Sequence, residues 1–271
     1  MPLTRIAESR VVELPQLRLH LLDWAGVEPP VLLLHPNRTN ARVWDFVVEH
    51  SRLPNRFLAP DQRGHGRSDY PAAGYLYEDY LGDMEGLLAA LGVARVHLVG
   101  AATGGNLALL LATRRPDLVE TLTVIDPGLS LDPGINRRVQ AQIANEFRFP
   151  SLAEARARMP FSALWSEEMK DHYSRHSFRE LEDGAVEWRY LPAGVAETEH
   201  LLEEPIWHLI SVSCPTLIAR GARSAVFPPA NMQRLHELIP GSRTLEIEAD
   251  HRVSQDNPAA LAAALDAFLG A

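Results

Sequence analysis

The stretch from Leu98 to Gly105 limits the fold of this chain more than any other part of the sequence. It consists of Leu98-Val99-Gly100-Ala101-Ala102-Thr103-Gly104-Gly105 and joins two runs, Arg95–Val99, which is typical of a buried strand, and Asn106–Arg114, which is typical of a helix. Glycines on both sides let the chain turn sharply from the strand into the helix. Such a turn lifts the side chain at its centre above the sheet. That side chain belongs to Ala102, whose methyl group carries no reactive atom.

Short apolar runs alternate with helical runs along most of the chain. Strands are predicted at Val11–Glu13, Leu17–Asp23, Val31–Leu34, Arg56–Ala59, Arg95–Val99, Leu122–Ile125, Thr216–Ala219 and Thr244–Ile247. Helices are predicted at Tyr77–Leu91, Asn106–Arg114, Pro229–Leu238 and Pro258–Leu269. Because this alternation is typical of a mostly parallel sheet with helices on both faces, the sequence predicts an α/β, doubly wound fold.

The alternation lapses between the sixth and seventh predicted strands. From Leu129 to Ile210 the sequence is helical in character and contains five prolines and three tryptophans. We expect this segment to be a helical cap, inserted after the sixth strand over the carboxyl edge of the sheet. Residues 129–210 would then form the cap, and residues 1–128 and 211–271 would form the α/β core.

Composition excludes several classes of function. The 271-residue chain has a formal net charge of −9 and no basic run, so nucleic acid is not an expected partner. It has neither a signal-peptide core nor a membrane span of ~20 apolar residues, so a soluble cytoplasmic protein without membrane contacts is expected. The single cysteine, Cys214, cannot form an internal disulfide. The cap histidines lack metal-site spacing, so no metal or other cofactor is expected, and the oligomeric state stays open.

Four segments of the chain resemble motifs of the α/β-hydrolase superfamily. They are Leu32–Asn37, similar to a strand with its oxyanion loop, Asp61–Asp69, close to D-x-R-G-x-G-x-S, Gly100–Gly105, similar to the nucleophile elbow, and Ala249–His251, at the place of the late histidine. Their order and spacing match the family over nearly the whole chain. The resemblance implies a capped enzyme of the serine-hydrolase type in which Ala102 occupies the nucleophile position.

The resemblance also implies roles for single residues. A serine at the position of Ala102 would be activated by a histidine base, which is expected at His251, and a carboxylate would orient that base. Many relatives place the carboxylate in the loop after the strand that follows the cap, but here that loop, Arg220–Val226, contains no acid. Asp126 fills an alternative place after the sixth strand, although an aspartate before Pro-Gly is also a common turn former. Asp250 adjoins His251 and is the weaker candidate.

The oxyanion hole of this family consists of backbone N–H groups that bind the negative charge developing on the substrate oxygen. The resemblance places these donors at Asn37 and Thr103. Pro36 stands where the family usually has glycine and lacks an N–H, so a different loop path is expected. His35 is expected to be structural rather than a base.

Three interpretations of Ala102 remain open. In the first, which the intact glycines and His251 favour, alanine replaces the serine of a hydrolase that acts on an ester, a lactone or a C–C bond next to a ketone in a small molecule. In the second, the alanine is natural and the chain binds a small molecule without hydrolysing it. In the third, His251 is the general base of a cofactor-free lyase or oxygenase. Thr103 argues against a haloalkane dehalogenase, which needs aspartate at position 102 and usually tryptophan after it.

Overall fold

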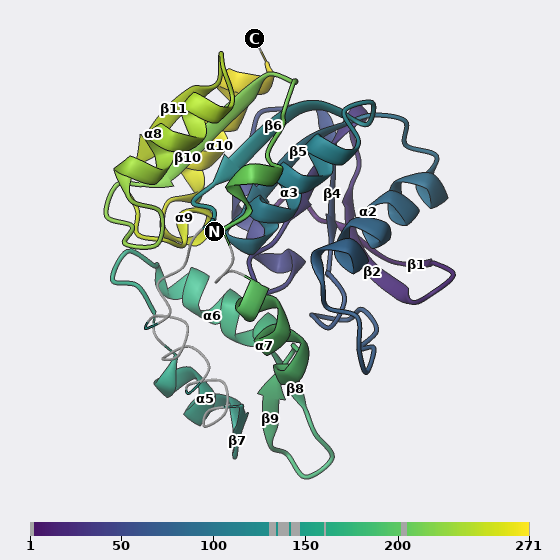
Figure 1. Cartoon of the computed structure of the whole chain (residues 1–271). Coiled ribbons are helices and arrows are strands. Elements are labelled where there is room, and N and C mark those ends of the chain that lie inside the picture. The colour runs from purple at the N-terminus through teal and green to yellow at the C-terminus, as the bar shows by residue number, and fades with distance from the viewer. Residues whose placement is uncertain are drawn as a thin grey trace.

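The computed structural model describes residues 3–129, 134, 141, 147–159, 161–201 and 205–270, apart from the side chains of residues 199 and 200. Its centre is an eight-stranded sheet in the order β1-β2-β4-β3-β5-β6-β10-β11 (Figure 1). The strands are β1 (Glu8–Glu13), β2 (Arg18–Trp24), β3 (Val27–Leu34), β4 (Asn55–Pro60), β5 (Val96–Ala101), β6 (Val119–Ile125), β10 (Thr216–Gly221) and β11 (Arg243–Ile247). β2 runs antiparallel to both β1 and β4, and all other neighbouring strands run parallel. The predicted mostly parallel α/β fold is confirmed.

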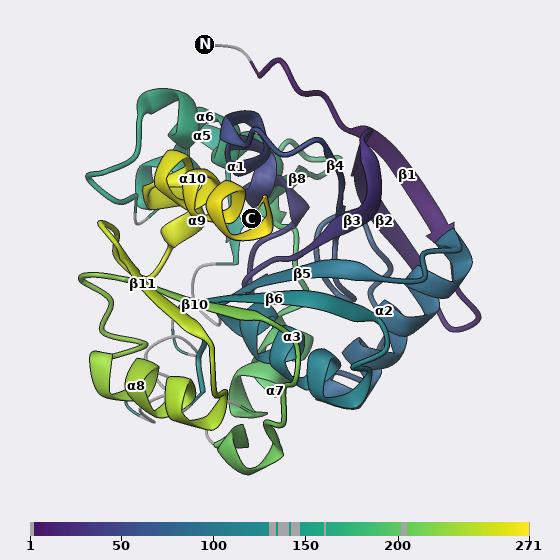
Figure 2. The same ribbon diagram turned by 90° about the horizontal axis from the view of Figure 1, so that it is seen from above.

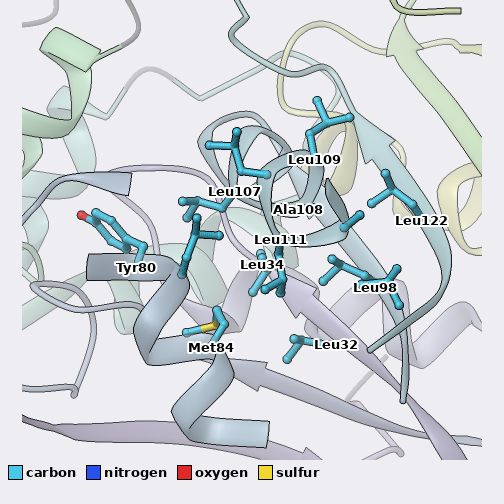
Figure 3. Close-up of a cluster of buried hydrophobic side chains, with 14 of the residues drawn as sticks. Leu32, Leu34, Tyr80, Met84, Leu98, Leu107, Ala108, Leu109, Leu111 and Leu122 are labelled. Atoms are coloured by element: carbon cyan, nitrogen blue, oxygen red, sulfur yellow. The ribbon is translucent and has the colours of Figure 1, made fainter. Parts of the chain in front are cut away.

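Helices cover both faces of the sheet (Figure 2). On one face lie α2 (Tyr77–Leu91), α3 (Thr103–Arg114) and α8 (Pro229–Leu238), and on the other lie η1 (Ala41–Trp44), α1 (Asp45–His50), α9 (Val253–Asp256) and α10 (Pro258–Leu269). Successive side chains of β3 point to opposite faces. Leu32 and Leu34 therefore join the core beneath α2 and α3 (Figure 3), whereas Val31 and Leu33 join the core beneath α1 and α10. Burial on both faces explains why this strand is apolar without alternation.

The segment between β6 and β10 forms a second layer of structure at one end of the core (Figure 1). It contains β7 (Arg148–Phe149), α5 (Leu152–Arg158), α6 (Glu167–Ser177), β8 (Phe178–Glu180), β9 (Val186–Trp188), α7 (Pro192–Leu201) and η2 (Ile206–Leu209). The helices agree with the expected helical character, but β7, β9 and β8 also form a separate three-stranded antiparallel sheet, which was not predicted because strands of two or three residues show no periodicity. Residues 130–133, 135–140, 142–146, 160 and 202–204 of the expected cap lie outside the described residues. The boundaries of the cap stay a prediction.

The strand order of the sheet reverses its winding direction at β3. β4 and β5 lie on opposite sides of β3, so the chain leaves β3 in one direction and returns on the other side. In open α/β sheets, ligands bind at the carboxyl edge where the winding direction reverses. The loop that carries Asn37 follows β3, and the turn that carries Ala102 follows β5, so both lie at this reversal.

Two glycines of the turn after β5 allow α3 to approach the sheet closely. A Cβ atom at Gly104 would lie 2.3 Å from the Leu34 carbonyl oxygen and 2.7 Å from that of His35. A Cβ atom at Gly100 would lie 2.1 Å from the Gly104 carbonyl oxygen. Both positions therefore exclude any larger residue, because backbone atoms cannot give way as a flexible side chain can.

We expect Gly104→Ala to lower the free energy of unfolding by roughly 3 kcal/mol, at the upper end of the cost of overpacking. The control is Gly82→Ala, in the middle of α2, where an added Cβ would meet nothing within 4 Å. Alanine is the better helix former, so this variant should be more stable by about 1 kcal/mol or less. Urea unfolding followed by circular dichroism measures both values, and equal stability of the two variants would contradict the packing argument.

Candidate active site

Ala102 lies at the apex of the turn between β5 and α3. Its backbone has φ 49° and ψ −118°, a strained conformation for a residue with a Cβ atom. Hydrogen bonds hold it on both sides, because its N–H donates to the Ile125 carbonyl oxygen at 2.9 Å and its own carbonyl accepts from the N–H groups of Gly105 and Asn106 at 2.9 and 3.1 Å. The position therefore has the backbone geometry of a nucleophile elbow but not the nucleophile.

Asp126 follows directly after β6 and has no exposed surface. One carboxylate oxygen, Oδ2, accepts a hydrogen bond from the backbone N–H of Gly221 at 2.8 Å. The other, Oδ1, accepts one from the Ser224 hydroxyl at 2.6 Å and is 2.7 Å from Nδ1 of His251. Donors from the last residue of β10, from the loop after it and from the loop after β11 thus compensate a buried carboxylate at the end of β6.

His251 lies in the loop between β11 and α9, and its imidazole is 34% exposed. The contact with the Asp126 carboxylate implies that Nδ1 carries a proton, which leaves Nε2 as the basic nitrogen. Because the N–H of Ala102 donates to the residue before Asp126, a short chain of contacts joins Ala102, Asp126 and His251 at the carboxyl edge. By contrast, Asp250 forms an ion pair with Arg223, at 3.1 Å, and is not the partner of the imidazole.

The two expected oxyanion donors, Asn37 and Thr103, lie in segments that pack against each other. Thr103 is the first residue of α3, and the first N–H groups of a helix have no partner within the helix, so they favour bound negative charge. Asn37 lies in the loop after β3, and the close approach of Gly104 to the carbonyl groups of Leu34 and His35 places the first turn of α3 against the start of that loop. The structure therefore brings the two donor segments together at the elbow.

Two buried histidines hold the loop after β3. Nε2 of His35 accepts the N–H of Gln62 at 3.0 Å, and Nε2 of His65 accepts the N–H of Arg38 at 3.2 Å. Burial lowers the pKa of His35, and burial together with the neighbouring His35 lowers the pKa of His65 to about 3. Both rings are therefore neutral near pH 7 and act as hydrogen-bonding supports for the loop, as expected for His35.

Ser224 is a part of the site that the sequence alone did not reveal. It lies in the loop after β10, where the sequence shows no acid, and its hydroxyl donates to Asp126. The same hydroxyl accepts backbone N–H groups from Val226 and Phe227 at 3.2 and 3.4 Å. A serine in the loop where many relatives carry the acid is the one signal that could have indicated this contact.

The described residues also bear on two other types of site. Among them, no group of three or more His, Cys, Asp or Glu side chains could hold a metal ion. Within the same part of the chain, no helix is both long enough and apolar enough to cross a membrane.

Comparison with protein families identifies the fold family. The family model described as "alpha/beta hydrolase fold" matches residues 29–258. The chain belongs to the α/β-hydrolase fold family. The match runs from within β3 to the first residue of α10 and so covers most of the main sheet.

Several relatives of this α/β-hydrolase are hydrolases. The 2-(acetamidomethylene)succinate hydrolase of Mesorhizobium japonicum is 28% identical over 97% of this chain and 95% of its own length. The lipase LipV of Mycobacterium tuberculosis is 29% identical over 93% of this chain and 98% of its own length. The crystal structure of E-2-(acetamidomethylene)succinate hydrolase matches with a TM-score of 0.89 and 25% identity, covering 98% of this chain and 100% of that one. By family, this chain is a hydrolase.

We expect Ser224→Ala to lower the free energy of unfolding by about 2 kcal/mol, because it removes a hydrogen bond to a buried carboxylate. Ser242→Ala is the control, since this equally buried serine pairs with a histidine ring, His236, at 2.9 Å and not with a carboxylate. The control should lose about 1 kcal/mol. Chemical denaturation of both variants tests the difference, and a smaller loss at Ser224 would mean that its hydroxyl does not support Asp126.

Proposed function

We propose that this chain is an α/β-hydrolase for a small carbonyl compound, and that Ala102 at the nucleophile position makes it inactive in acyl transfer. The substrate class is an ester, a lactone or a C–C bond next to a ketone. The observation that carries the proposal is the 2.7 Å contact between His251 and Asp126, whose carboxylate is fully buried and held by two further donors. This is the arrangement of a base and the group that orients it.

In an active form, a serine hydroxyl at position 102 would add to the carbonyl carbon while Nε2 of His251 accepts its proton. The carbonyl oxygen becomes an anion, which the N–H groups of Asn37 and Thr103 stabilise. When this intermediate collapses, the leaving group takes the proton from His251, and an acyl-enzyme remains. Water then attacks the acyl-enzyme in the same way, with His251 again accepting the proton. Collapse of this second intermediate releases the acid and returns the proton to the serine. Asp126 stabilises the imidazolium in both halves of the reaction.

Alanine at position 102 removes only the nucleophilic attack and leaves the base and the oxyanion donors in place. Loss of a nucleophile that works as part of a triad typically lowers turnover by about 10⁶-fold, because the remaining groups have no covalent intermediate to act on. The change from hydroxyl to hydrogen removes little volume, so binding should be retained. The relatives support a small-molecule substrate, since one of them is named as a hydrolase of 2-(acetamidomethylene)succinate. We place the cap at residues 129–210 and the protein in the cytoplasm as parts of the same proposal.

A second candidate function is general-base catalysis by His251 without a covalent intermediate, as in a cofactor-free lyase or oxygenase. The observation that favours it is that the pair of Asp126 and His251 is complete although Ala102 carries no nucleophile. Nε2 of His251 would take a proton from a carbon next to a carbonyl group, and the N–H groups of Asn37 and Thr103 would hold the enolate oxygen. Binding without turnover is the outcome if neither chemistry is found.

We expect Ala102→Ser to hydrolyse p-nitrophenyl esters or lactones at a rate well above that of the unchanged chain. Ala101→Ser is the matched control, because it adds the same hydroxyl one residue away, on a side chain that joins the core beneath α1 and α10. Adding His251→Gln to Ala102→Ser should abolish the activity. Stopped-flow and steady-state assays over a broad panel of acyl chains measure these rates. Failure of folded Ala102→Ser to exceed Ala101→Ser on every substrate would refute the acyl-transfer proposal.

We expect the unchanged chain to exchange the α-protons of a 1,3-diketone for deuterium in D₂O if base chemistry is its function. General-base catalysis typically contributes about 10²- to 10⁴-fold, so His251→Gln should slow the exchange by at least 10²-fold. His236→Gln, on α8, is the control and should have no effect, because this ring pairs with Ser242 and not with Asp126. Proton NMR follows the exchange, and equal rates for the unchanged chain and His251→Gln would exclude this second function.

A further inference from the structure

Trp165, which lies in the segment between β6 and β10 (the cap segment), contacts two residues that follow His251 in the chain. Its indole N–H donates to Oδ1 of Asp256, four positions beyond Arg252, at 2.7 Å. The guanidinium carbon of Arg252 lies 5.6 Å from the centre of the indole system. Trp165 is only 4% exposed, so both contacts are sheltered from water.

Asp256 also binds the residue that precedes His251 in the chain. Its second oxygen, Oδ2, accepts the backbone N–H of Asp250, the residue before His251, at 2.9 Å. Asp256 is the last residue of α9 and is buried with the rest of that helix. A single carboxylate therefore joins a side chain of the cap segment to the backbone that carries the imidazole.

Packing within the cap segment fixes the side chain of Trp165, so the indole would move together with this segment. The ring centres of Trp165 and Phe161 lie 5.6 Å apart, and those of Trp165 and Tyr173 lie 5.2 Å apart. These aromatic neighbours, in the loop before α6 and on α6 itself, fix the orientation of the indole. Hydrogen bonds to a carboxylate are roughly twice as strong as those between neutral groups, and burial strengthens them further. A displacement of this segment would therefore break or lengthen the bond to Asp256 and release the loop from Asp250 to Arg252.

We propose that Trp165 is a positioning residue for His251: by holding Asp256, it aligns the imidazole over the elbow only when the cap segment is seated on the core. The catalytic half of this inference rests on the proposed role of His251 as the base, whereas the structural half does not. A misplacement of about 1 Å can lower the rate of a positioned reaction by about 10²-fold, so the contact can control turnover without touching substrate.

Hydrogen exchange in chains that keep Ala102 tests whether Trp165 holds the loop that carries His251, and it requires no enzymatic activity. Trp165→Phe keeps the aromatic packing and removes the N–H, so the backbone amides from Asp250 to Asp256 should exchange at least about tenfold faster. Trp24→Phe is the matched control, because this buried tryptophan also donates its indole N–H, to the Arg5 carbonyl at 3.2 Å, on another side of the molecule. Mass spectrometry of peptides covering residues 248–257 measures the rates. Unchanged exchange in Trp165→Phe would overturn the proposal.

Kinetics in the Ala102→Ser background test the catalytic half. Trp165→Phe and Asp256→Asn should each lower kcat by about 10- to 10²-fold with KM changed less than about twofold, and Trp24→Phe should change neither. Because the two residues act through one contact, the double variant should be no slower than the slower single variant. Multiplicative effects would show that Trp165 does not act through Asp256 and would overturn the proposal. If Ala102→Ser itself is inactive, the proposed function fails, and the exchange experiment alone decides the role of Trp165.

Discussion

The buried carboxylate of Asp126 is the interaction on which the arrangement of the site depends. A carboxylate without exposed surface is tolerated only where hydrogen-bond donors surround it. Gly221, the last residue of β10, and Ser224, in the loop that follows, supply such donors, and His251 supplies one from the loop after β11. The charge at the end of one strand therefore sets the conformation of two further loops and the orientation of the imidazole, and the loss of any donor would affect the others.

Much of the fold could be predicted because its long elements have a clear period. The helices at Tyr77–Leu91, Pro229–Leu238 and Pro258–Leu269 have the expected bounds. The short helices α1 and α9 and the cap strands β7, β8 and β9 were not predicted, because helices of four to six residues and strands of two or three residues are too short to show a period. β3 begins at Val27, earlier than the predicted start at Val31, and its pairing with β4 shifts register between these two residues, a stretch that contains Pro29 and Pro30.

The candidate site also contains residues that could be predicted from sequence and contacts that could not. Ala102, Asp126 and His251 could be located from sequence through the resemblance to the α/β-hydrolase motifs, and each of them follows a strand of the main sheet. The contact of Ser224 with Asp126 and that of Trp165 with Asp256 could not, because they join residues 98 and 91 positions apart. Which side chains meet over such a separation depends on loop and cap conformations that no local pattern encodes.

The connection between β6 and β10 has a consequence for how proteins of this shape diversify. The two strands are parallel neighbours, with Leu122 paired to Thr216, so the chain leaves at the carboxyl edge and must re-enter at the opposite edge. Its last part, which contains Ile206, Trp207 and Ile210, packs into the core beneath α2 and α3 and completes this return. The residues before it form a detour whose length the strand ladder does not restrict. The chain between these two strands can therefore vary in length and structure, while the pairing of β6 with β10 keeps its register.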